Sequence, residues 1–163
     1  MNFEPFFKSP THDRSIHHIR ELNFVNSEMS NFTRAVGSSS MFFFYFFAIG
    51  NCRNLTLDDV KSFPVGKPTN EITKRISNLF AELMTDFNKN SLIKSRGDTS
   101  FQEFNWGASK PIIDEIDKVL AAHYGFTEEE LDFIINYDIK YRMGKELDSE
   151  SSEESTQAQL AFS

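Results

Sequence analysis

The segment Ser109-Lys-Pro-Ile-Ile-Asp-Glu-Ile-Asp-Lys-Val-Leu-Ala-Ala-His-Tyr-Gly-Phe-Thr-Glu-Glu-Glu-Leu-Asp-Phe-Ile-Ile135 decides the fold, because it holds the signals for two consecutive helices. Ser109 is a good N-cap, and the following proline suits a first helical turn. Gly125 is expected to end the first helix, and Thr127 with Glu130 has the spacing of a capping box. Apolar residues recur at helical steps at Ile113, Ile116 and Leu120. The segment therefore predicts a helical hairpin.

Acidic residues follow the start of the first of these helices. They are Asp114, Glu115 and Asp117. Carboxylates near a helix N-terminus interact favourably with the helix dipole. We therefore expect these three side chains to stabilise their own helix.

Further helical segments precede the hairpin. Residues from Ser27 to Ile49 end in Met41-Phe-Phe-Phe-Tyr-Phe-Phe-Ala-Ile49, and Gly37 with the serines after it predicts a kink before that run. A helix that is apolar all round is expected to be buried, and Gly50 is expected to end it in the left-handed conformation. Thr56 with Asp59 has the spacing of an N-terminal cap for a short helix, and Thr69 to Asn88 has the apolar periodicity of a longer amphipathic helix. A membrane span needs roughly 20 apolar residues, which the aromatic run does not reach.

Extended structure is predicted in two places. Phe3 to Lys8 and Ile16 to Val25 have strand-like composition with a turn-rich stretch between them, which indicates an N-terminal hairpin. Ser91 to Trp106 has partly alternating segments around Gly97-Asp98 and indicates a second hairpin or an extended loop.

The sequence thus predicts one α+β domain, mostly helical, over residues 1–147. Its parts are a small N-terminal β element, a buried aromatic helix, a long amphipathic helix and a C-terminal helical hairpin. Residues 148–163 are acidic and poor in apolar side chains, which indicates a disordered tail. The single cysteine fits a reducing compartment, and the N-terminus has no signal-peptide pattern, so we expect a cytoplasmic protein.

The chain contains no catalytic motif that we can identify. Its 7 glycines are scattered, so no glycine-rich nucleotide loop is present. One cysteine and the adjacent His17 and His18 do not form a zinc pattern. Acid-x-Lys pairs at Asp59 and Asp138 occur in metal-dependent nucleases, but they are also ordinary on charged helices. We therefore expect no catalytic, cofactor or metal residue in this chain.

Ser109 to Gly144 closely resembles the C-terminal end of N6-adenine DNA methyltransferases of type II and type IIG restriction–modification systems. Upstream, Ser38 to Pro64 resembles the specificity region of the same family, with an aromatic helix, the polar loop Asn51-Cys-Arg-Asn-Leu55 and a short helix ending in Phe-Pro. Ile19-Arg-Glu-Leu-Asn-Phe24 fits the approach to that helix. The resemblance covers about residues 3 to 147 and is closer over the last third.

The resemblance implies target recognition on double-stranded DNA without methyl transfer. The family's cofactor loop for S-adenosylmethionine and its Asn/Asp-Pro-Pro-Tyr/Phe segment, which receives the flipped adenine, are absent from this chain, whose 5 prolines are all isolated. A separate catalytic methyltransferase chain is therefore the expected partner. The chain is then a split or truncated gene product, or a separately made specificity subunit.

Base edges are commonly read by Arg and Asn, and phosphates are bound by Lys and Arg. On that basis the candidate DNA-binding residues are Asn51, Arg53, Asn54, Lys94, Arg96 and Lys110. Each of them has an ordinary structural alternative, such as a helix cap, an ion pair or a solvated charge.

Charge distribution permits a DNA contact in the middle of the chain. The net charge is −7, but residues 51–111 carry nine basic and seven acidic side chains, so the excess acidity lies beyond them. Two other interpretations stay open: a protein-interaction module that docks on a catalytic methyltransferase or nuclease subunit, and a nonfunctional remnant whose aromatic helix promotes aggregation.

Overall fold

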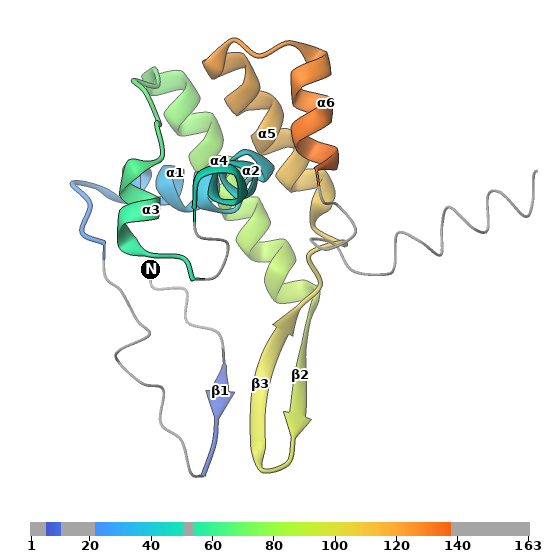
Figure 1. Cartoon of the computed structure of the whole chain (residues 1–163). Coiled ribbons are helices and arrows are strands. Elements are labelled where there is room, and N and C mark those ends of the chain that lie inside the picture. Colours follow the sequence, from blue (N-terminus) through green and yellow to red (C-terminus); the bar gives the residue numbers. More distant parts are fainter. Residues whose placement is uncertain (1–5, 11–21, 51–53, 138–163) are drawn as a thin grey trace, which may run out of the picture.

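The computed structural model describes residues 6–10, 22–50 and 54–137. In these ranges the chain forms six helices and three short strands (Figure 1). Their bounds in chain order are β1 Phe7–Lys8, α1 Ser27–Gly37, α2 Ser40–Ile49, α3 Leu57–Ser62, α4 Asn70–Lys89, β2 Ser91–Arg96, β3 Thr99–Phe104, α5 Lys110–Tyr124 and α6 Glu128–Asn136. The α+β, mostly helical class predicted from the sequence is confirmed.

The helices form one hydrophobic core. α4 packs against α1 on one side and α5 on the other, and α6 packs against α5 and α2. The fully buried aliphatic side chains come from the predicted stripes of α4 and α5, where Ile76, Leu83, Ile113, Ile116 and Leu120 lie. Close-packed apolar burial of this kind supplies most of the stability of helices of this length.

Local signals place most helix ends where the sequence predicts them. Thr56 and Thr127 both form complete capping boxes, with Asp59 and Glu130 as the reciprocal partners. Gly125 ends α5 with a φ of 74°, a left-handed conformation that costs glycine little because it has no Cβ. These ends are fixed by residues a few positions apart, which is why the sequence alone reveals them.

The break before the aromatic helix is also confirmed. α1 and α2 meet at 63°, and Ser39 caps α2 by accepting a hydrogen bond from the backbone of Phe42. The predicted burial of α2 is confirmed for its N-terminal part, whereas Ile49 at its C-terminal end is 71% exposed. Gly50 follows α2 with a φ of −75°, so the predicted left-handed ending is wrong.

The N-terminal hairpin predicted from Phe3 to Val25 is not seen where the structure describes the chain. β1 pairs with β3, more than ninety positions away, with Phe7 opposite Phe101 and Lys8 opposite Ser100. Leu22 to Val25 form no strand, and residues 11–21 lie outside the described ranges. The second predicted hairpin is confirmed as β2 and β3, which form a three-stranded antiparallel sheet with β1 in the order β1-β3-β2.

The apolar helices are short for a membrane span. Among the described residues, no single helix combines the length and the apolar composition needed to cross a bilayer; only the bent pair of α1 and α2 meets that test jointly. The tail predicted over residues 148–163 lies outside the described ranges.

Candidate nucleic-acid interface

The hairpin of β2 and β3, called the ribbon below, extends away from the helices and has its turn at the far end (Figure 1). Gly97 lies in that turn with a φ of 59°. β2 is an edge strand, because β1 pairs with the opposite side of β3. The ribbon therefore presents one free edge and two faces to its surroundings.

Strand register decides which side chains share a face of the ribbon. Lys94 is opposite Phe101, and Arg96 is opposite Thr99. Since side chains alternate along a strand, Lys94 and Arg96 lie on the same face. Two of the six predicted DNA-contacting residues are thus brought together on an exposed strand.

The two basic side chains of that face differ in their surroundings. The ammonium group of Lys94 forms an ion pair with the carboxylate of Glu103, its diagonal neighbour on β3. Arg96 lies at the exposed end of β2, beside the turn. Its side chain forms no ion pair or hydrogen bond with the described part of the chain. Arg96 is therefore the basic group of the ribbon that is available to a ligand.

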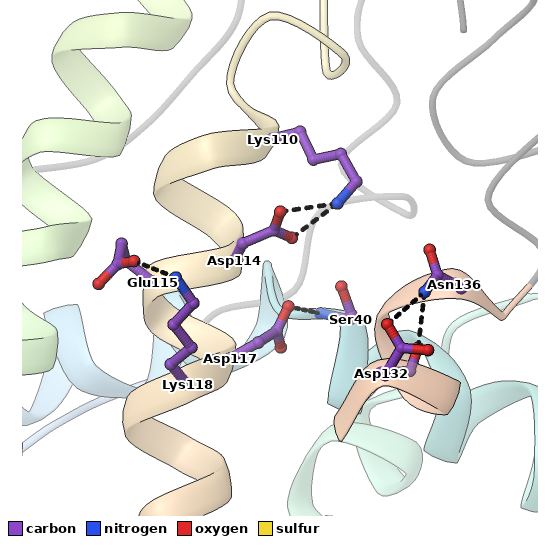
Figure 2. Close-up of polar contacts among 8 residues, drawn as sticks. All are labelled: Ser40, Lys110, Asp114, Glu115, Asp117, Lys118, Asp132 and Asn136. Atoms are coloured by element: carbon purple, nitrogen blue, oxygen red, sulfur yellow. Dashed lines mark hydrogen bonds and ion pairs between the residues drawn. The ribbon is translucent and has the colours of Figure 1, made fainter. Parts of the chain in front are cut away.

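Lys110 is placed differently. It lies in the first turn of α5, where its Nζ donates to the Oδ1 and Oδ2 atoms of Asp114 at 2.9 and 2.7 Å (Figure 2). Only 18% of the Lys110 side chain is exposed. The charge of Lys110 is thus partly hidden and already balanced, which weakens it as a phosphate contact.

The remaining candidates belong to the loop between α2 and α3. Asn54 is exposed just before α3. Asn51 and Arg53 lie outside the described residues. Among the four candidates that the structure describes, Lys94 and Arg96 are therefore the two that it brings together.

The base of the ribbon is held firmly against the helices. The rings of Trp106 and Phe87 lie with centroids 4.7 Å apart, and Phe104 also packs on Phe87. The hydroxyl of Ser109 donates to Oδ2 of Asp86 at 2.5 Å, which joins the start of α5 to the end of α4. These contacts fix the direction in which the ribbon leaves the helical core.

The Ser109 contact corrects the sequence analysis. Ser109 occupies the N-cap position of α5, as expected, but its side chain makes no capping hydrogen bond. Its backbone has a φ of −91° and a ψ of 0°, outside the extended region of a usual N-cap, so the hydroxyl bonds to Asp86 instead.

Side-chain hydrogen bonds link the strands along the ribbon. The amide of Gln102 donates to Ser91 Oγ at 2.8 Å, and its oxygen accepts from the Phe6 backbone at 3.1 Å. The hydroxyls of Ser95 and Ser100 are 2.9 Å apart. Each link restrains two neighbouring strands, so the ribbon resists twisting and slippage of its register.

Asp117 is a further residue whose role the sequence does not reveal. It is fully buried, and its carboxylate accepts a hydrogen bond from the backbone N–H group of Ser40 at 3.2 Å (Figure 2). It also accepts one from the backbone N–H group of Met41 at 3.3 Å. Asp117 therefore stabilises the N-terminus of α2, not that of its own helix. The predicted role of the acidic residues on α5 is wrong in this respect, and none of them falls in the first turn of α5.

Asp114 instead forms a partly buried ion pair with Lys110, and Glu115 forms an exposed ion pair with Lys118, both within α5. The ion pair raises the pKa of Lys118 and lowers that of Glu115, mainly through the hydrogen bond between the two side chains (Figure 2). Both groups are solvent exposed, so this pair contributes little to stability. No group of three potential metal ligands lies close together among the described residues.

An apolar surface lies where α2 meets α6. Phe44 contacts both Phe133 and Tyr137 edge-on, and Phe47 contacts Tyr137. We call these four residues the aromatic surface. Phe133 is 59% exposed and Phe47 is 39% exposed, which is unusual for rings that are part of a contiguous cluster.

Comparison with known proteins identifies no relative of this chain: no protein-family model, no curated protein and no solved structure matches it.

Proposed function

We propose that this protein recognises a DNA target for a site-specific adenine-N6 DNA methyltransferase of a restriction–modification system, and that another polypeptide carries out the methyl transfer. In this proposal the chain binds double-stranded DNA in the cytoplasm. S-adenosylmethionine binds to the catalytic partner, because the cofactor and Pro-Pro motifs are missing from this sequence.

One observation carries the proposal. A hydrogen-bonded β-ribbon projects from the helices (Figure 1). Its register places Lys94 and Arg96 on one face. The major groove of B-DNA is about 12 Å wide and admits β-strands, whose side chains then reach base edges and phosphates. Because β1 lies along the other side of β3, the free edge strand β2, which carries both residues, is the strand that would enter the groove. The contacts of Trp106 and Ser109 at the base of the ribbon give it the fixed direction that groove recognition requires.

The resemblance of Ser109 to Gly144 to the C-terminal end of the methyltransferase family supports the same function. The charge of the whole chain, −7, does not favour DNA binding, but most of the excess negative charge lies beyond residue 111. Residues 51–111, which include the ribbon, carry more basic than acidic side chains. When the basic residues are confined to one small element of an acidic protein, we expect that element to bind the DNA and the rest of the surface to contribute little.

The test is a duplex-binding measurement on the full chain. We expect fluorescence anisotropy to detect binding to a random-sequence duplex pool, with the logarithm of the affinity falling linearly with the logarithm of the salt concentration. Rounds of selection from that pool should enrich a defined sequence. Replacing Lys94 and Arg96 together by glutamine should weaken binding about tenfold or more.

A matched control removes the same charges elsewhere. Lys74 and Arg75 are neighbouring exposed residues near the start of α4, at the end of that helix away from the ribbon. Replacing both by glutamine should change binding by less than about threefold. Equal losses in the two double variants, or no duplex binding even at low salt, would contradict the proposal.

A second candidate function is docking on the catalytic subunit through the aromatic surface. The exposure of Phe47 and Phe133 favours it, because exposed clusters of large apolar side chains commonly mark protein interfaces. Apolar docking should persist at high salt, whereas DNA binding should not. Co-purification with the polypeptide encoded immediately upstream, repeated with Phe133→Ser, tests this candidate; a complex that the substitution leaves unchanged would contradict it.

A further inference from the structure

The unequal surroundings of the two basic residues on the ribbon indicate different roles for them. The carboxylate of Glu103 offsets the positive charge of Lys94 on this face of the ribbon. A DNA phosphate would have to displace a carboxylate held on the neighbouring strand. Lys94 therefore contributes less to phosphate binding than its exposure suggests.

Arg96 differs from Lys94 in its surroundings. It is exposed at the end of β2, its side chain has no ion-pair partner among the described residues, and its cross-strand neighbour is the small residue Thr99. The guanidinium group is planar and presents paired N–H donors in a fixed fork. That fork matches the O6 and N7 acceptors of guanine in the major groove, a pairing that an ammonium group makes less well.

The ribbon restrains the backbone that carries this arginine. Ser95, the preceding residue, is joined to Ser100 across the strands at 2.9 Å, and Thr99 is joined to Ser9 next to β1 at 3.1 Å. A phosphate contact tolerates a mobile cation, whereas a bidentate base contact requires a fixed approach. The hydrogen bonds of the preceding residue Ser95 and of the cross-strand neighbour Thr99 hold the strands in place beside Arg96, which suits base recognition.

We infer that Arg96 is a specificity-determining residue that reads a guanine in the major groove of the target, while Lys94 stays paired with Glu103 and does not determine the sequence. This inference rests on the proposed DNA-binding function. It adds that the recognised sequence contains a guanine whose selection depends on one side chain.

The experiment is selection from a random duplex pool with four forms of the full chain: the wild type, Arg96→Lys, Arg96→Ala and Lys94→Gln. Arg96→Lys is the decisive variant because it keeps the positive charge and removes the planar fork. We expect the wild type to prefer guanine at one position by about 5- to 150-fold. Arg96→Lys and Arg96→Ala should lose that preference, and Lys94→Gln should keep it.

The outcomes separate the inference from the proposed function. If Arg96→Lys keeps the guanine preference, or Lys94→Gln alone abolishes it, the inference is wrong while DNA recognition stands. If the site selected by the wild type shows no guanine preference at any position, the inference about Arg96 is also wrong, while DNA recognition stands. If the wild-type chain binds no duplex, the proposed function itself fails. Circular dichroism should show unchanged folding, because both residues are exposed.

Discussion

The carboxylate of Asp117 on α5 lies 3.2 Å from the backbone nitrogen of Ser40, at the first residue of α2. Seventy-seven positions separate the two residues in the chain. A helix N-terminus carries unpaired N–H groups and a partial positive charge, so a buried carboxylate there is both hydrogen-bonded and electrostatically favoured. This contact joins the C-terminal helical hairpin to the aromatic helix.

Replacing Asp117 by asparagine should therefore destabilise the protein. The amide keeps one oxygen acceptor, but its NH2 group faces a backbone N–H, and the negative charge is lost. We expect the free energy of unfolding to fall by about 2 kcal/mol or more, measured by urea denaturation. Glu115→Gln on the same helix is the control, and its exposed ion pair with Lys118 predicts a loss below about 1 kcal/mol. Similar losses for both variants would contradict the role of Asp117.

Removing the hydroxyl group of Tyr124 should stabilise the protein. The oxygen is buried and has no hydrogen-bond partner among the described residues, and burial raises the pKa of Tyr124 to about 12. Tyr124→Phe is expected to increase stability by about 1 kcal/mol. Tyr45→Phe is the control: its hydroxyl donates to the Ser62 carbonyl at 3.0 Å, so its loss should lower stability by about 1 kcal/mol.

The same tyrosine predicts a pH dependence. Because folding raises the pKa of Tyr124 from 10.0 to about 12, ionisation of this side chain costs no stability below pH 10. As the pH rises from 10 through about 12, the unfolded chain ionises first, so the protein loses stability. Thermal unfolding measured across this range should show a smaller alkaline decrease for Tyr124→Phe than for the wild type. Parallel curves for the two proteins would refute this assignment.

The contact between Ser109 and Asp86 should appear as an energetic coupling. If the Ser109 hydroxyl bonds to Asp86, Ser109→Ala and Asp86→Asn remove parts of the same interaction, and their effects should not add. We expect a coupling free energy of about 1 kcal/mol or more from a double-mutant cycle. Additive effects would favour a capping role for Ser109, which the sequence suggested.

Trp106 provides a spectroscopic test of how the ribbon is anchored, since it is the only tryptophan of the chain. Phe87→Leu removes the ring against which Trp106 packs and should shift the Trp106 emission to longer wavelength, with a stability loss of about 1 to 3 kcal/mol. Phe133→Leu, at the aromatic surface, should leave the emission unchanged. An unchanged emission in Phe87→Leu would mean that this contact does not hold the ribbon.

The type of secondary structure at the candidate site was predictable from the sequence. Alternation around Gly97-Asp98 predicts a hairpin or an extended loop that carries Lys94 and Arg96, and the structure confirms the hairpin. Its register and the pairing of Lys94 with Glu103 were not predictable, because they depend on which residues face each other across two strands. The ion pair of Lys110 with Asp114 has a local signal, because residues four positions apart are neighbours on a helix surface.

The sequence by itself determined the features that depend on near neighbours. The capping boxes at Thr56 and Thr127, the left-handed Gly125 and the apolar stripe of α5 each arise from residues within a few positions of one another, so propensity and periodicity suffice. Tertiary structure alone decided the partner of β1, the hydrogen bond of Ser109 and the burial of Asp117. In each case, a polar group can bond either to a neighbour in the sequence or to a distant segment. The packing of the core determines which of these partners lies within hydrogen-bonding distance.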